Sequence, residues 1–117
     1  MNKYEHVFVV RPDVSPAQVE NTIEAIKSLV EEKGGKVYKT EYWGLRTLAY
    51  RLNKNRKGHY GYLDMEAHNG VLDAVEYRQK FADDVIRYMT VKVNEISSEP
   101  SAVLRRGDDR KRRERND

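Results

Sequence analysis

The amino-acid sequence predicts an α+β protein in which one antiparallel sheet carries two helices on a single face. Two kinds of segment alternate along its 117 residues: extended runs of β-branched and aromatic residues, and stretches whose apolar residues have helical spacing. Their order is strand, helix, strand, strand, helix, strand. A chain of this length is most economically one domain, and this order then favours a two-layer βαββαβ sandwich of the ferredoxin-like type.

The first strand and helix have clear boundary signals. Residues 4–11 are β-branched and aromatic and end at a proline, which is typical of a strand. Ser15 is followed by a proline and then by Gln18, the signature of a capped helix start. Apolar residues then recur at spacings of four, three and four between positions 19 and 30, and Gly34 ends the helix.

The remaining elements are predicted from the same signals. Residues 36–52 are extended, with a bend at Gly44, and Asn69 is the expected N-cap of the second helix. The last four segments are a polar turn, a strand, a helix and a final strand: residues 53–58, 60–66, 69–81 and 85–93.

Both faces of the predicted sheet carry large apolar residues. In the first strand Tyr4 and Phe8 alternate with Val7 and Val9, and two helices can cover only one of these faces. An apolar second face predicts a protein partner, with ordinary surface aromatics as the alternative. Three aromatic residues are the candidates for this protein-partner face: Trp43, Tyr60 and Tyr62.

Charge is unevenly distributed along the chain. The formal net charge is +3, but residues 1–104 hold 15 Lys and Arg against 15 Asp and Glu. Residues 33–60 hold eight bases and one acid, so a basic hairpin is expected on an acidic frame, where it attracts a polyanion. Residues 1–94 are predicted to fold. Residues 95–117 are expected to form a flexible charged C-terminal tail, whose disordered basic part from Arg105 onward is expected to bind RNA or a partner.

Composition argues against several classes of protein. The chain has no cysteine and no apolar run near the ~20 residues that span a bilayer, so a cytoplasmic protein without disulfides or membrane contact is expected. Its three histidines lack metal-ligand spacing, and the adjacent acids Asp83 and Asp84 are typical of a solvated helix end. We therefore expect no catalysis, metal, cofactor or small-molecule ligand.

Residues 42–62 favour RNA binding. They contain five bases and five aromatic residues and no carboxylate. Basic side chains in one hairpin can reach phosphates and release counterions, although a solvated hairpin tip is the simpler alternative. Tyr50 could stack on RNA or lie in the core. The predicted RNA-contacting residues of this segment are Arg46, Arg51, Lys54, Arg56 and Lys57.

Two other classes of protein remain as alternatives. Residues 60–65 partly match the third strand of a free-standing RNA-recognition motif, but alternation turns Phe8 inward and so removes a stacking platform. A small ferredoxin-like enzyme or ligand sensor would instead need a deep pocket and a homodimer formed through the open sheet face.

The run from Trp43 to Tyr50, Trp-Gly-Leu-Arg-Thr-Leu-Ala-Tyr, resembles the bacterial small-subunit ribosomal protein family numbered six, the S-six family. Tyr4-Glu5, Lys54 and the run 85–89 match the same family in order, so the resemblance covers about residues 3–93. Thr47 and the pair Arg51-Leu52 depart from the usual pattern.

The resemblance implies a structural, non-catalytic protein. It would bind 16S rRNA in the central-domain platform of the small subunit, as a heterodimer with ribosomal protein S-eighteen. Arg87 belongs to a matched run and is therefore expected to contact rRNA, with an ion pair to Asp83 or Asp84 as the alternative.

Overall fold

The computed structural model describes residues 1–52 and 55–95, without the side chains of residues 49–52. Lys54 and the predicted tail from residue 96 onward lie outside this part of the chain. Six elements occur in the predicted order: β1 (Asn2–Val10), α1 (Pro16–Glu32), β2 (Lys36–Leu52), β3 (Asn55–Ala67), α2 (Asn69–Phe81) and β4 (Val85–Val93).

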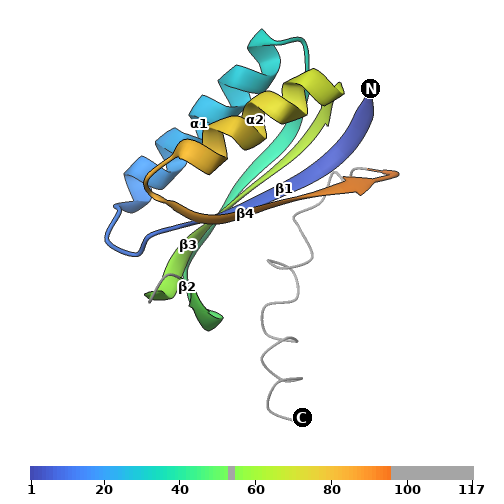
Figure 1. The fold of residues 1–117 in the computed structure, drawn as a ribbon. Helices are drawn as coiled ribbons and strands as arrows, with labels where there is room; N and C mark the ends of the chain where they lie inside the picture. Colours follow the sequence, from blue (N-terminus) through green and yellow to red (C-terminus); the bar gives the residue numbers. More distant parts are fainter. Residues whose placement is uncertain (53–54, 96–117) are drawn as a thin grey trace.

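The four strands form one antiparallel sheet in the order β2-β3-β1-β4. Figure 1 shows α1 and α2 side by side on one face of this sheet, while no helix of the described residues covers the other face. The ferredoxin-like α+β prediction is therefore confirmed. β1 and β3 lie at the centre, so residues that alternate along them determine what each face presents.

The core lies between the helices and one face of the sheet. Phe8 is 0% exposed and packs with Tyr4, Val10 and Leu63 from the sheet. The buried stripe of α1 has the spacing that the sequence predicts, and it consists of Val19, Ile23, Ile26 and Val30. The inward orientation predicted for Phe8 is confirmed, and no ring at this position is available to stack on a nucleobase.

The ends of α1 follow local chemistry. The Ser15 hydroxyl accepts a hydrogen bond from the Gln18 N–H at 3.2 Å, which satisfies one of the free donors of the first turn. At the other end the Gly35 N–H donates to the Val30 carbonyl at 2.8 Å, directly after Gly34. Gly34 has a φ of +93°, the left-handed conformation in which helices commonly end.

Gly44 bends β2, as the sequence predicts. Its φ is +88°, and the pairing with β3 shifts at this point. Tyr42 lies opposite Gly61 and Gly44 lies opposite Tyr60, so Trp43 is an extra residue in the ladder. Such a bulge needs a residue that tolerates positive φ and re-aims the neighbouring side chain.

Two predicted boundaries are wrong. β3 begins at Asn55, and Thr47 pairs with Lys57, so much of the predicted turn at residues 53–58 is strand. These polar residues lie on a two-stranded ribbon beyond the end of β1, and the exposed Arg56 and Lys57 show no apolar alternation that would reveal the strand. The N-cap of α2 is His68, which makes no side-chain capping hydrogen bond, so the prediction of Asn69 is off by one residue.

A buried polar cluster joins β1, β4 and α2. His6 Nε2 lies 2.9 Å from Gln79 Nε2, and because an amide nitrogen only donates, this ring nitrogen accepts. His6 Nδ1 therefore carries the proton and donates to Thr90 Oγ1 at 2.8 Å. Burial lowers the pKa of His6 to about 4, so the ring is neutral near pH 7.

Candidate RNA and protein interfaces

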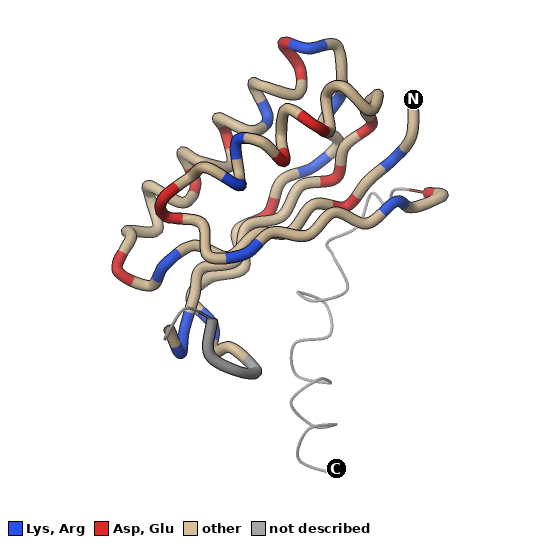
Figure 2. The backbone as a smooth tube through the Cα atoms, in the orientation of Figure 1, with Lys and Arg blue, Asp and Glu red and all other residues tan. Residues whose placement is uncertain are grey.

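The β2–β3 hairpin extends beyond the rest of the sheet. β1 ends at Val10, opposite His59, so residues 46–57 have no third strand beside them. We call these residues the hairpin tip. Figure 2 shows Lys and Arg at the tip, at the far end of the two strands from most of the acidic positions. The tip contains no Asp or Glu.

A histidine anchors the base of the hairpin tip. The Nε2–H of His59 donates to the Pro12 carbonyl at 3.3 Å, so its Nδ1 accepts from the Tyr42 hydroxyl at 2.7 Å. These two bonds join both strands of the hairpin to the loop after β1. The tip is therefore held at its base by specific contacts, although no third strand covers it.

The predicted RNA-contacting residues divide between this tip and the sheet. Arg56 and Lys57 are exposed on the tip. Arg46 is half-buried, and its Nε–H donates to the Trp43 carbonyl at 3.0 Å, which orients its side chain. The backbone of Tyr50 and Arg51 lies in β2, but their side chains are outside the described residues, as is all of Lys54.

The bare side of the sheet, which we call the open face, carries the predicted partner aromatics. Trp43 stacks on Tyr62, with ring centroids 5.1 Å apart, and on Tyr60 at 5.9 Å. Tyr62 is only 4% exposed, so it supports Trp43 and adds little surface of its own. Trp43 and Tyr60 are half-buried and accessible to a partner.

A carboxylate network lies beside these rings. The Tyr62 hydroxyl lies 2.5 Å from Asp64 Oδ1 and 3.0 Å from Glu5 Oε2, and Lys39 Nζ lies 3.4 Å from Asp64 Oδ2. Burial, and next the hydrogen bond to Asp64, raises the pKa of the Tyr62 hydroxyl, which therefore remains a donor. Asp64 is 1% exposed, so its charge depends on these partners.

Sequence reasoning missed this network, although a signal for it exists. Glu5 alternates with the inward-facing residues of β1, and Asp64 alternates with Leu63 of β3, so both acids belong on the open face. Their pairing across the sheet, Glu5 opposite Asp64, depends on the register of β1 with β3. The sequence does not specify that register.

Arg87 lies on the open face and not on the hairpin tip. It pairs with Val9, and Val9 pairs in turn with Tyr60, so the three residues form a row across β4, β1 and β3. Asp84 lies 2.5 Å from Arg11 instead, and no ion pair of Arg87 occurs in the described part of the chain. A depression of about 240 Å³ borders it, lined by Val7, Val9, Tyr60, Arg87, Tyr88 and Met89.

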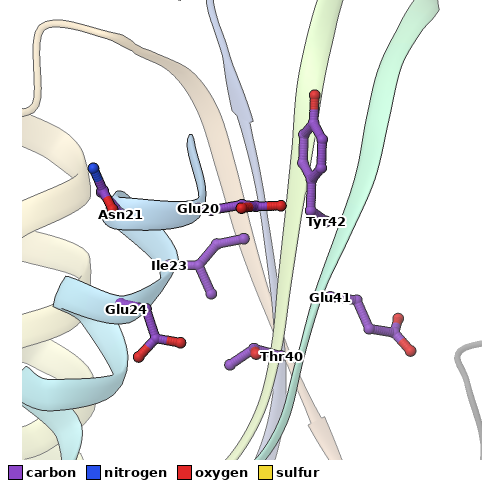
Figure 3. A pocket seen from close by; sticks show the side chains of 7 residues that line it. All are labelled: Glu20, Asn21, Ile23, Glu24, Thr40, Glu41 and Tyr42. Atoms are coloured by element: carbon purple, nitrogen blue, oxygen red, sulfur yellow. The ribbon is translucent and has the colours of Figure 1, made fainter. Parts of the chain in front are cut away.

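A second hollow, of about 360 Å³, lies between α1 and β2. In Figure 3, Glu20 and Glu24 on α1 stand across from Thr40 and Tyr42, and Glu41 points away from the helix. Carboxylates at this edge repel phosphate groups. This hollow is therefore not a continuation of a phosphate-binding surface.

Within residues 1–52 and 55–95, no three His, Asp or Glu side chains are grouped closely enough to hold a metal ion. No helix there is long and apolar enough to cross a bilayer.

Comparison with known proteins identifies the family. The family model for ribosomal protein S6 matches residues 3–92. The chain is 57% identical to small ribosomal subunit protein bS6 of Maricaulis maris, over 99% of this chain and 100% of that protein. It is 51% identical to bS6 of Hyphomonas neptunium, with 95% and 99% covered.

A solved structure agrees with these relatives. The crystal structure of 30S ribosomal protein S6 from Thermotoga maritima superposes with a TM-score of 0.73 at 26% identity, covering 96% of this chain and 97% of that one. These relatives are ribosomal proteins and not enzymes. The chain therefore belongs to the ribosomal protein S6 family of the small ribosomal subunit.

Proposed function

We propose that this protein binds 16S rRNA in the central-domain platform of the small subunit, as a heterodimer with ribosomal protein S-eighteen. It has no catalytic role and acts in the cytoplasm, on the ribosome. The observation that carries the proposal is the separation of two surfaces on the same two strands. The hairpin tip is cationic and lacks acids, and the open face is aromatic and apolar.

The hairpin tip is the proposed rRNA contact. Arg56 and Lys57 are exposed, and neither forms an ion pair with a described residue. Arg46 is oriented by the Trp43 carbonyl near the base of the tip. We include Lys54 and Arg51 among the proposed rRNA contacts because of their positions in the sequence. Tyr50 remains a candidate for stacking on RNA.

The open face is the proposed protein contact. Trp43 and Tyr60 present ring surface there, and Met89 and Val91 are 50% and 44% exposed on the edge strand. A protein whose folded body has no excess of positive charge binds RNA weakly alone. A basic partner on the open face would add phosphate contacts and cover these apolar groups.

Fractionation of ribosomes tests the assembly part of the proposal. We expect the endogenous protein to co-sediment with the small subunit and to leave it in high salt. Finding the protein wholly in the soluble pool would contradict the proposal.

Salt titration tests the RNA surface. Replacing Lys54, Arg56 and Lys57 together with Gln should reduce the slope of log K against log salt by about 2 to 3, because each lost phosphate contact contributes about 0.7 to 0.9. The binding assay uses the heterodimer and a 16S rRNA central-domain fragment. The matched control replaces Lys27 and Lys33 of the first helix region with Gln. An unchanged slope in the triple variant would move the RNA surface elsewhere.

The free-standing RNA-recognition alternative predicts sequence-specific binding of single-stranded RNA by the isolated protein. The burial of Phe8 argues against it, because the ring that would stack on a base is 0% exposed. Tyr60→Ala separates the two functions, since Tyr60 lies on the open face. We expect this variant to weaken the heterodimer and to leave the salt slope of RNA binding unchanged.

A further inference from the structure

Arg87 is an exposed guanidinium in an apolar setting. It stands at the rim of the 240 Å³ depression, whose other lining residues on the open face are Val7, Val9, Tyr60 and Met89. Apolar walls exclude water on one side, and a charge-assisted bond to the guanidinium is therefore stronger here than at a fully solvated site. The depression is also large enough to receive an aliphatic side chain.

No Asp or Glu side chain of the described residues forms an ion pair with the Arg87 guanidinium. Asp84, the nearest candidate in the sequence, is paired with Arg11, and Asp64 is paired with Lys39. Glu5 accepts a hydrogen bond from the Tyr62 hydroxyl at 3.0 Å. The ion-pair alternative for Arg87 therefore lacks a partner in this part of the molecule.

Position separates Arg87 from the hairpin tip. Lys57 is three residues along β3 from Tyr60, and Tyr60 is two strands away from Arg87. At 3.3 Å per residue and 4.8 Å per strand, the backbones of Arg87 and Lys57 are roughly 10 Å apart in each direction. Lys57 also alternates to the face opposite Tyr60, so Arg87 and Lys57 present their charges to different parts of the surface.

The surrounding charges favour a single carboxylate over a nucleic-acid strand. Glu5 lies four residues from Val9 along β1, roughly 13 Å from the Arg87 row, which exceeds the Debye length of about 8 Å at physiological salt. A lone carboxylate at Arg87 would therefore feel little repulsion from Glu5. A polyanion lying along the open face would meet the half-buried Glu5.

We propose that Arg87 is the ion-pair anchor of the protein-partner interface and not an rRNA contact. A carboxylate of the partner binds the guanidinium, and an adjacent aliphatic side chain of the partner fills the depression beside Met89. Arginine with a desolvated partner is a frequent energetic centre of protein interfaces. This inference rests on the proposed function, because it requires a protein on the open face.

The test measures heterodimer affinity by titration calorimetry with the S-eighteen protein. Arg87→Gln should raise Kd by about 30-fold or more, because it leaves a carboxylate of the partner unpaired. Arg87→Lys should have an intermediate effect, since it keeps the charge but loses the planar fork. The matched control Arg56→Gln should leave Kd within about twofold. Arg87 is exposed, so an unchanged melting temperature should show that each variant is folded.

A second readout separates the two surfaces. With the partner at saturating concentration, Arg87→Gln should leave the salt slope of RNA binding unchanged, and Arg56→Gln should lower it by about 0.7 to 0.9. If Arg87→Gln lowers the slope and leaves Kd for the partner unchanged, Arg87 is an RNA contact and the inference is wrong. Failure of the unmodified protein to bind S-eighteen at all would instead contradict the proposed function.

Discussion

The hairpin tip and the open face lie on the same two strands, yet different forces organise them. On the tip, the exposed cations Arg56 and Lys57 project from a two-stranded ribbon that has no third strand beside it. On the open face, Trp43 stacks on two tyrosines and buried Asp64 is held by hydrogen bonds and an ion pair. The first region is organised by charge and the second by packing.

Substitutions in the two regions should therefore have different effects on binding and on stability. Charges on a solvated ribbon contribute little to folding, so their removal should change binding alone. Rings and carboxylates that support one another belong to the folded core of the molecule, so their removal should change stability as well. Stability measurements can therefore draw the boundary between the two regions.

Of the substitutions considered, Phe8→Ala should lower the free energy of unfolding most, because Phe8 belongs to the packed region. The ring is fully buried between β1 and the helices, and its loss should cost about 3–5 kcal/mol of unfolding free energy. Denaturant unfolding measures this change, with Val91→Ala on the exposed edge of β4 as the control. An equal, small loss in both variants would contradict the core position of Phe8.

His6 should make the packed region sensitive to acid. Its pKa is about 4 in the fold, against 6.5 as the ordinary value, so between these values the unfolded chain binds the proton and the folded chain does not. Stability should therefore fall as pH drops from about 6.5 to about 4, by about 3 kcal/mol in total. Unfolding titrations at a series of pH values measure this slope.

His6→Gln should remove that part of the pH dependence, whatever its effect at neutral pH. The control is His68→Gln at the exposed N-cap of α2, which should keep the slope of the unmodified protein. Equal slopes in the two variants would show that protonation of His6 is not responsible.

Tyr62→Phe tests whether the carboxylate network of the open face stabilises the fold. Loss of the hydroxyl leaves Asp64, which is 1% exposed, with one hydrogen-bond donor fewer, and this should cost about 1–3 kcal/mol. Tyr60→Phe is the matched control, because no hydrogen bond of the Tyr60 hydroxyl occurs in the described structure. Thermal unfolding that ranks the two variants equally would argue against the carboxylate network.

Arg56→Gln combined with Lys57→Gln should have the smallest effect on folding. Both side chains are exposed on the tip, so the unfolding free energy should stay within about 0.5 kcal/mol of the original. Denaturant unfolding at low and high salt checks this expectation. A large loss of stability would mean that the tip is part of the packed body.

Much of the fold was predictable from local patterns. Alternation along β1 places Phe8 inward and Val9 outward, and the spacing of Val19 and Ile23 predicts the buried face of α1. The start of β3 was not predictable, because polar residues on an uncovered ribbon carry no alternation. The predicted N-cap of α2 was off by one residue. His68, a weak capping residue, occupies this position without a side-chain hydrogen bond.

The residue types of the candidate site were predictable from the sequence. Which of these residues lie side by side was less predictable. The acid-free run around Arg56 and the aromatic pair Trp43 and Tyr60 both stand out in the sequence. The prediction that Arg87 contacts rRNA rests on a matched motif, and the position of Arg87 in a row with Val9 and Tyr60 depends on strand register. Register is a property of pairing between distant segments, and no local pattern records it.

The sequence by itself determined the order of elements, the inward and outward residues of each strand and the family. These depend on periodicity, capping and short motifs, all of which act between near neighbours in the chain. Only the tertiary structure decided which outward residues meet. It brought Glu5 opposite Asp64, stacked Trp43 over Tyr62 and paired Asp84 with Arg11, so that Arg87 has no ion pair within residues 1–52 and 55–95. Such contacts join different strands and loops, and strand order and register bring them together.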